Sequence, residues 1–230
     1  MQQELIIDFK FEGKYVVMVG GGTEAHCKIQ SFLDAGSKVI VISRSFSRGI
    51  LNLYDKKMID LQKAEIKDGK SFVKQLNPKP DLLAVATSNH KLNAQLATCA
   101  KSEGFMVYVA DNPSISDFIL PAVSKIGEVR IALSTGGKSP AMAKTLRKRI
   151  ERLITKEDLL HIELQEYLRA ILKREISEQK FRKKILYEVL EDKGINELLK
   201  RAKMNKAKKE ALTIMERLRA EENLNNREIT

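Results

Sequence analysis

Three consecutive glycines form the first group of residues that could bind a charged ligand. Gly20 and Gly22, with Ala25 three residues later, fit the pattern G-x-G-x-x-A between an apolar run and a stretch with helical periodicity. In this pattern the first glycine permits a tight turn, and the second lets the backbone approach a pyrophosphate. The N–H groups that begin the helix would face the phosphates. The motif predicts a dinucleotide site; the alternative is a glycine turn that binds no ligand.

The end of the next expected strand lacks the acidic residue that usually binds the ribose hydroxyls of NAD. Ser43, Arg44 and Ser45 stand there instead. A guanidinium at this place could pair with the 2′-phosphate of NADP. The alternative is that Arg44 is a loop residue and that Ser43, Ser45 or backbone groups hold the ribose.

One carboxylate, that of Asp111, follows the last of the expected parallel strands. Ligands of open α/β sheets bind at the carboxyl ends of the strands. An acid there could face a nicotinamide and act as a base, or it could bind a cation. The alternative is that Asp111 caps the turn that it forms with Asn112 and Pro113.

A second polar glycine loop, STGGKSP, spans residues 134–140. It is not a P-loop, because the leading glycine of that motif would fall at Ala132. Ser139 and Pro140 are a favoured helix start, and a helix N-terminus suits carboxylates or phosphates. The loop is therefore a candidate substrate site, with a tight strand-to-helix connection as the alternative. The side chains expected to contact substrate are those of Ser134, Thr135 and Lys138.

Alternating strand and helix patterns position these residues in the first part of the chain. Short apolar runs separated by helical patterns predict a parallel sheet with right-handed crossovers, which is a Rossmann-like α/β fold. The expected strands are residues 14–19, 38–42, 59–66, 81–87 and 106–110, and the expected helices between them are 23–35 and 92–102.

The pattern changes after the fifth strand. One further strand is expected at residues 128–134, and the chain is then predicted to be almost entirely helical, with Gly194 separating two helices. The apolar stripes of these charged helices are narrow. The sequence thus predicts three parts: a dinucleotide-binding domain at residues 1–112, a small α+β dimerisation and substrate segment at 113–150, and a helical C-terminal domain at 151–230.

Composition limits the class of protein. The chain has 230 residues, 43% of them hydrophobic, which excludes intrinsic disorder and allows a core without disulfides. Forty-one basic and 30 acidic residues give a net charge of +11, of which residues 1–150 carry +8. A basic protein is suited to a polyanionic partner. Nucleic acid is not favoured, because the C-terminal part is nearly neutral and contains no Trp.

Metals and membranes are not favoured either. Cys27 and Cys99 lack metal-ligand spacing and are expected to be reduced thiols, and the three histidines are scattered. No apolar run reaches the roughly 20 residues that cross a bilayer. The N-terminus lacks the residue order of a signal peptide. A cytoplasmic protein is therefore expected.

Four stretches of the chain resemble the precorrin-2 dehydrogenases of siroheme biosynthesis, some of which are also sirohydrochlorin ferrochelatases. They occur in the family's order and spacing and cover essentially residues 5–155. The last two stretches are specific to this family, whereas the first stretch alone would not identify it. The stretches are VMVGGGTEAHCKI (17–29), AVATSNHKLN (84–93), VADNPSISDFILPAV (109–123) and IALSTGGKSPAMAKTLRKRIE (131–151).

The resemblance implies roles for individual residues. Asp111 would be the catalytic aspartate, and Thr87 would close the cofactor cleft. The family generally uses NAD and also lacks the ribose acid, so NAD is expected over NADP. The chain departs from the family at Glu24, where a hydrophobic residue is usual, and at Cys27, where a basic one is usual. Together with Gly20 and Gly22, the residues implied to line the dinucleotide are Thr23, Glu24, Arg44 and Ser45.

The activity that the resemblance implies is NAD-dependent oxidation of precorrin-2 to sirohydrochlorin. The substrate is a polycarboxylate tetrapyrrole, which suits a basic α/β region. One alternative is a bifunctional enzyme, with lyase activity, that also inserts Fe²⁺ as a substrate. Another is a non-catalytic module that senses a dinucleotide or binds a partner protein. A homodimer is expected, because the strand at 128–134 and the narrow helical stripes need a partner surface.

Overall fold

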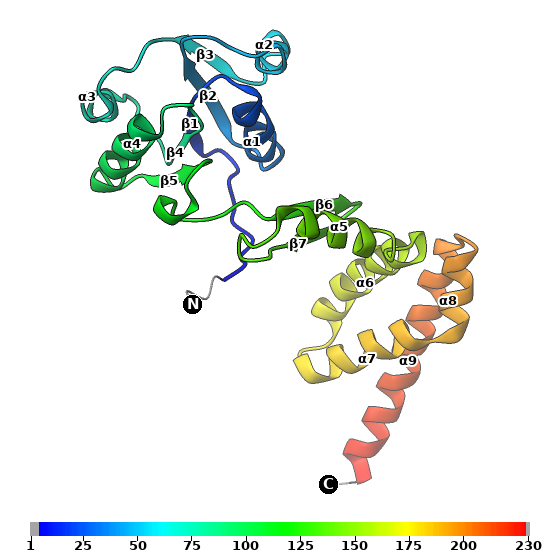
Figure 1. Ribbon diagram of the computed structural model, residues 1–230. Coiled ribbons are helices and arrows are strands. Elements are labelled where there is room, and N and C mark those ends of the chain that lie inside the picture. Colours follow the sequence, from blue (N-terminus) through cyan, green and yellow to red (C-terminus); the bar gives the residue numbers. More distant parts are fainter. Residues whose placement is uncertain (1–4, 229–230) are drawn as a thin grey trace. The chain divides into compact units, whose positions relative to one another are not determined.

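The computed structural model describes residues 5–228 and divides into two compact units (Figure 1). The first unit ends at Leu120, and the second begins at Pro121. Each unit has buried apolar clusters of its own. The chain therefore contains two separately packed parts.

A five-stranded parallel sheet forms the centre of the first unit (Figure 1). Its strand order is β3-β2-β1-β4-β5, and each neighbouring pair is parallel. This arrangement confirms the Rossmann-like α/β fold that the sequence predicts. The strands are β1 (Tyr15–Val19), β2 (Lys38–Ser43), β3 (Asp60–Lys63), β4 (Leu82–Val85) and β5 (Met106–Val109), and the helices are α1 (Thr23–Asp34), α2 (Arg48–Asp55), α3 (Gly69–Gln75) and α4 (His90–Ser102).

Two apolar cores cover the two faces of this sheet. Helices α1 and α2 pack on one face, and α3 and α4 pack on the other. In β1, Val16 and Met18 belong to the first core and Val17 and Val19 to the second, and all four are at most 2% exposed. Burial on both faces explains why the strands are continuous apolar runs rather than alternating ones.

Helices α2 and α3 are not predicted by apolar periodicity, because each is short. The buried residues of α2 are Ile50 and Leu53, and those of α3 are Gly69 and Val73. Asp68 caps the start of α3, where its carboxylate accepts hydrogen bonds from backbone N–H groups. Two buried residues do not make a recognisable helical stripe.

The turn between β1 and α1 is held by close backbone contacts. Gly20 has φ +124°, and a Cβ there would lie 2.3 Å from the carbonyl oxygen of Ala86. A Cβ at Gly21 would lie 1.9 Å from the carbonyl oxygen of Ser45, whereas one at Gly22 would meet no atom within 4 Å. The packing of the protein itself therefore requires the first two glycines but not the third.

An antiparallel hairpin begins the second unit. Strand β6 (Ala122–Ile126) pairs with β7 (Val129–Leu133) around Gly127, which has φ +56°. The strand predicted at residues 128–134 is present, and it pairs with β6, a strand that the sequence does not predict. Only Ser124 of β6 is buried, so this strand carries no apolar run that the sequence could reveal. Helix α5 (Pro140–Glu151) packs on both strands.

Helices α6 to α9 share one core. Leu164, Leu168 and Leu172 of α6 are fully buried, as their helical spacing predicts. Helix α6 begins with a capping box in which Thr155 and Asp158 each accept a hydrogen bond from the backbone N–H of the other. The four helices are α6 (Lys156–Glu175), α7 (Gln179–Glu191), α8 (Lys193–Lys200) and α9 (Met204–Glu228).

Gly194 does not separate two helices, which corrects the sequence prediction. It lies in the first turn of α8, and the break between α7 and α8 falls at Asp192. The Asp192 carboxylate accepts a hydrogen bond from the N–H of Ile195 at 2.8 Å. A capping aspartate starts a helix, whereas a glycine typically ends one by adopting a positive φ, which Gly194 does not.

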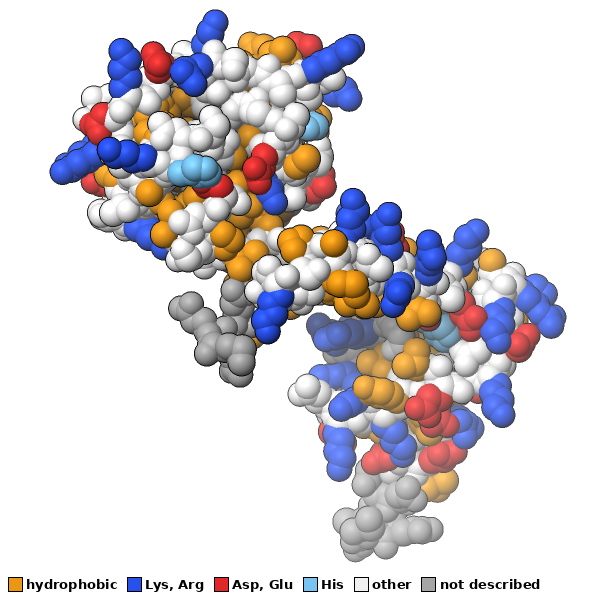
Figure 2. Space-filling model, viewed as in Figure 1, with side chains coloured by type: hydrophobic (Ala, Val, Ile, Leu, Met, Phe, Trp, Pro, Cys, Tyr) orange, Lys and Arg blue, Asp and Glu red, His pale blue; other side chains and the backbone are white. Residues whose placement is uncertain are grey.

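Charges of both signs cover the surface. Figure 2 shows Lys and Arg side chains over both units, interspersed with acidic ones and with apolar patches. Residues 121–150 hold seven basic residues and one acidic residue, so the hairpin and α5 carry a net positive charge. Within the described part of the chain, no helix is long and apolar enough to cross a membrane.

Gly21→Ala is expected to destabilise the first unit, because the added Cβ would overlap the Ser45 carbonyl and force the backbone to shift. Overpacking of this kind typically costs about 1–3 kcal/mol. Gly22→Ala is the matched control, since its Cβ meets no atom within 4 Å. Denaturant titration followed by circular dichroism measures the free energy of unfolding of both variants. Equal stability would contradict the close contact at Gly21.

Candidate functional site

The predicted site residues of the first unit gather at one edge of the sheet. The strands are parallel, so their carboxyl ends meet at this edge, and the strand order reverses between the adjacent β1 and β4. Ligands of such sheets bind in the crevice at this switch point. The residues that follow these strand ends are Gly20, Gly22, Thr23, Glu24, Arg44, Ser45, Thr87 and Asp111.

The N-terminus of α1 offers backbone donors to a ligand. Gly22 is the N-cap residue, and no side chain caps the helix by a hydrogen bond. The N–H groups of the first turn, beginning with Thr23, are therefore available to an anion. Together with the open space beside Gly22, this arrangement fits a pyrophosphate.

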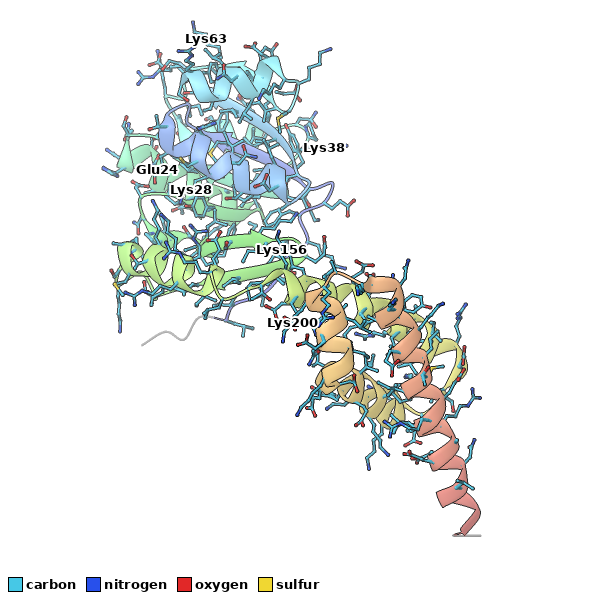
Figure 3. The ribbon with its side chains drawn as sticks, turned by 90° about the vertical axis from the view of Figure 1, so that its right-hand side faces the viewer. Glu24, Lys28, Lys38, Lys63, Lys156 and Lys200 are labelled. Carbon is cyan, nitrogen blue, oxygen red and sulfur yellow. The ribbon has the colours of Figure 1, made fainter. Side chains whose placement is uncertain are left out.

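The segment after β2 packs against the glycine turn and presents Arg44. The guanidinium of Arg44 lies 3.6 Å from the carboxylate of Glu65, and both side chains are more than half exposed. An exposed ion pair of this kind contributes little to stability, so it does not hold Arg44 in place. Lys63, labelled in Figure 3, pairs in register with Ser43 and adds a second positive charge to this edge.

A chain of hydrogen bonds joins Thr87, Asn93, Asp111 and His90. Asn93 is only 1% exposed. Its Nδ2 donates to the carbonyl of Thr87 and to Oδ1 of Asp111, each at 3.0 Å, and its Oδ1 accepts from the Thr87 hydroxyl. Oδ2 of Asp111 is hydrogen-bonded to Nδ1 of His90. The network ties the ends of β4 and β5 to the first turn of α4, which fixes the Asp111 carboxylate.

The turn after β5 is capped by the neighbour of Asp111. The side chain of Asn112 accepts a hydrogen bond from the N–H of Ser114 at 3.2 Å. It thereby begins the short helix η1 (Pro113–Ile115). Asp111 instead contacts α4, so its carboxylate is free of the capping role.

His90 and Asn93 are not predicted as site residues from the sequence. The signal that could have revealed them is their spacing of three residues at the start of a helix, which puts them on one face. Asp111 follows them by 21 and 18 residues, respectively. Local sequence does not show that this face of α4 meets the end of β5.

Glu24 and Lys28 project from neighbouring turns of α1 (Figure 3). The Nζ of Lys28 lies 5.8 Å from the ring centroid of Tyr108 in β5. Burial is the main reason why the pKa of Tyr108 is raised; the charge of Lys28 opposes the shift, and that of Glu24 adds to it. Lys28 therefore places a positive charge near Glu24, which is one of the two positions where the chain departs from the family pattern.

The residues predicted to bind substrate lie in the second unit, between β7 and α5. Oγ of Ser134 accepts a hydrogen bond from the N–H of Gly136, and Oγ1 of Thr135 accepts one from the N–H of Ser139, each at 3.1 Å. Both hydroxyls thus stabilise the loop itself. Lys138 is exposed, so of the three predicted residues it is the one that presents a charge to solvent.

Two family models match the chain. A model for NAD(P)-binding proteins matches residues 7–122, which include the whole five-stranded sheet and Asp111. The model for the central part of sirohaem biosynthesis proteins matches residues 127–153, which include the second strand of the hairpin, β7, and all of α5. The two models thus meet near the boundary between the compact units.

Individual relatives agree with these models. A precorrin-2 dehydrogenase of Methanosarcina barkeri is 32% identical over 184 residues, which are 80% of this chain and 81% of that protein. A siroheme synthase of Methylococcus capsulatus is 39% identical over 140 residues, which are 60% of this chain and 28% of that protein. The chain therefore spans less than a third of this siroheme synthase.

The fold also has a solved counterpart. SirC, a precorrin-2 dehydrogenase, matches with a TM-score of 0.71 over 91% of this chain and 100% of that chain, at 20% sequence identity. The likeness to SirC shows that the two proteins share a fold. The sequence identity to the Methanosarcina barkeri protein shows the family to which the chain belongs. The chain belongs to the precorrin-2 dehydrogenase family of siroheme biosynthesis, and its first unit is the NAD(P)-binding domain of that family.

Proposed function

We propose that the protein oxidises precorrin-2 to sirohydrochlorin with NAD as the hydride acceptor. The observation that carries the proposal is the Asp111 carboxylate, which Asn93 and His90 hold at the same sheet edge as the glycine turn. Membership of the precorrin-2 dehydrogenase family supports the choice of substrate. The reaction removes one hydride and one proton from the substrate.

The residues at the sheet edge fit a dinucleotide. The N-terminus of α1 and the space beside Gly22 would hold the pyrophosphate, and Arg44 and Ser45 would hold the ribose. The nicotinamide supplies a hydride acceptor when the cofactor is bound. Glu65 beside Arg44 offsets the positive charge that would attract a 2′-phosphate, and this favours NAD. The positive charge of Lys63 would attract a 2′-phosphate and therefore favours NADP.

Asp111 is the base of the proposed reaction. Its carboxylate is anchored by the Asn93 amide on one oxygen and is only 21% exposed. A base held in this way has a fixed direction for proton transfer, which typically contributes about 10²–10⁴-fold to the rate. Asp111 would accept the proton that leaves the substrate carbon as the hydride departs.

The second unit supplies positive charge for a polycarboxylate. Seven of the residues in 121–150 are basic and one is acidic. Lys138 stands at the N-terminal end of α5, whose backbone N–H groups also favour anions. We assign the carboxylates of the tetrapyrrole to this region, with Ser134 and Thr135 shaping the loop.

Gly22→Asp is expected to weaken NAD binding by at least about tenfold, or about 1.4 kcal/mol, because a carboxylate would stand beside the pyrophosphate. The fold should persist, since Asp is a good N-cap and a Cβ at this position meets no atom. Calorimetric titration with NAD and with NADP measures both affinities. Gly22→Asn adds similar bulk without charge and separates repulsion from crowding. Unchanged NAD affinity of Gly22→Asp would refute the pyrophosphate site. If the unaltered protein bound NADP more tightly than NAD, the cofactor would be NADP.

Asp111→Asn is expected to lower kcat by at least about 10²-fold, because the amide cannot accept the substrate proton. The variant keeps the size of the side chain and an oxygen for the Asn93 bond, so the dissociation constant for NAD should change little. Anaerobic turnover of precorrin-2 with NAD, followed by NADH absorbance, measures kcat. Near-normal turnover would show that the carboxylate is not the base.

The same assay separates the two alternative functions. A protein that binds NAD but does not oxidise precorrin-2 at all would be a dinucleotide-sensing module. Addition of Fe²⁺ after sirohydrochlorin has formed tests for iron insertion. If Asp111→Asn lost iron insertion but kept dehydrogenation, the protein would be bifunctional, with Asp111 assisting the second step.

We further propose that the protein is a homodimer. Exposed apolar side chains of the second unit support this state, among them Val123 (53% exposed), Met142 (46%) and Leu153 (72%). Covering such side chains is favourable. Sedimentation velocity at micromolar concentration is expected to give twice the 26.1 kDa chain mass, and Val123→Asp should shift the protein toward the monomer. A monomer of the unaltered protein would contradict the proposal.

A further inference from the structure

His90 contacts the proposed base through one nitrogen and leaves most of its ring in solvent. Its Nδ1 is hydrogen-bonded to Oδ2 of Asp111, and its side chain is 82% exposed, against 21% for that of Asp111. The imidazole is therefore held at one end and accessible to a ligand at the other. The role proposed for Asp111 does not use this accessible end.

The Asp111 carboxylate determines which tautomer His90 adopts. An ionised carboxylate only accepts hydrogen bonds, so Nδ1 is the ring nitrogen that carries the proton and donates it to the bond. In a neutral imidazole the other nitrogen, Nε2, is then a hydrogen-bond acceptor. The carboxylate is itself held by Asn93, whose Nδ2 donates to Oδ1 of Asp111 at 3.0 Å. The network therefore presents Nε2 to solvent as an acceptor beside the carboxylate.

A substrate that gives a proton to Asp111 comes within reach of this acceptor. A carboxylate has about four acceptor sites, so the bonds from Asn93 and His90 leave others for the substrate proton. The substrate must approach the carboxylate closely, and His90 contacts one of its oxygens. The carboxylates of a tetrapyrrole are ionised near neutral pH and only accept hydrogen bonds. Its hydrogen-bond donors are the N–H groups at the centre of the ring.

We propose that Nε2 of His90 accepts a hydrogen bond from a ring N–H of the tetrapyrrole and so places the macrocycle against Asp111. This inference rests on the proposed dehydrogenase function and adds a substrate-binding residue to it. Flexible lysine side chains recognise carboxylates as point charges and impose little direction. A hydrogen bond to the centre of the ring is directional, so it determines how the ring lies relative to the base.

The place of His90 in α4 favours the neutral imidazole that this contact requires. His90 is the first residue of α4, where the helix dipole disfavours a positive charge. The Asp111 carboxylate acts in the opposite direction. An imidazole group is mainly neutral at about pH 8, so measurements at this pH test the acceptor form.

His90→Asn separates the two ends of the imidazole. The Asn amide nitrogen can replace Nδ1 as the donor to Asp111, but the side chain ends there and offers no acceptor in place of Nε2. The KM for precorrin-2 is expected to rise about three- to tenfold, which corresponds to one neutral hydrogen bond. The kcat and the dissociation constant for NAD should stay within about twofold, because a lost binding contact raises KM alone. Since His90 is so exposed, the variant should fold.

A matched pair of ligands tests the ring N–H groups directly. Copper(II) replaces the ring N–H protons of sirohydrochlorin, leaves its carboxylates unchanged and favours a planar set of four nitrogens. The unaltered protein is expected to bind sirohydrochlorin about three- to tenfold more tightly than the copper complex. His90→Asn should bind the two ligands equally. Anaerobic titrations followed by absorbance measure the four affinities.

Lys91→Gln is the matched control, since Lys91 is the exposed neighbour of His90 in the same turn of α4. It removes a positive charge and leaves the acceptor of His90 in place. The ratio of the two affinities should therefore stay that of the unaltered protein, even if a lost charge weakens the binding of both polycarboxylates.

Several results would overturn the inference while leaving the dehydrogenase function intact. Equal affinity of the unaltered protein for the two ligands, or an equal loss of both in His90→Asn, would show that His90 binds a carboxylate as an imidazolium. A fall in kcat at unchanged KM would show that His90 only holds Asp111, and a loss confined to NAD would place the nicotinamide at Nε2. Absence of precorrin-2 oxidation by the unaltered protein would overturn the proposed function itself, and the inference with it.

Discussion

The close backbone packing of the glycine turn is the constraint on which the cofactor site depends. A Cβ at Gly20 would overlap the carbonyl of Ala86 after β4, and one at Gly21 would overlap that of Ser45 after β2. Only glycine at both positions lets β1 end in contact with the chain that follows each of its neighbours. This contact brings the N-terminus of α1 to the point where the strand order reverses. Gly22, by contrast, faces open space, so the packing of the turn does not require a glycine there.

A buried amide, that of Asn93, holds the Asp111 carboxylate at the same edge of the sheet. Asn93 is 1% exposed, and a buried polar group left without partners costs about 1–3 kcal/mol. Its partners, Thr87 and Asp111, lie beyond the ends of two adjacent strands, β4 and β5. The amide that must be satisfied for the protein to fold therefore also holds the carboxylate. Its donor contacts one oxygen of the Asp111 carboxylate, and His90 contacts the other.

Much of this arrangement is predictable because it is encoded locally. The buried runs of the sheet, the glycine turn and the place of Asp111 after β5 all follow from residues adjacent in sequence. The partners of Asp111 do not, since the face of α4 that carries Asn93 meets Asp111 only through the tertiary fold. Strand β6 is equally hidden, because its one buried residue is the polar Ser124. Gly194 misleads for a related reason: a helix end is set by backbone conformation and by the cap at Asp192, and the residue type alone shows neither.

Several positive charges of α5 lie close together. Lys144 and Lys148 are exposed one turn apart, and like charges at this spacing destabilise a helix by a few tenths of a kcal/mol. Arg147 is relieved by Glu151 at 3.3 Å, but residues 121–150 together hold only one acidic side chain. A polycarboxylate ligand would supply the missing negative charge. The hydroxyls of the preceding loop are already used within the loop itself, so the second unit would bind such a ligand mainly through ammonium and guanidinium groups.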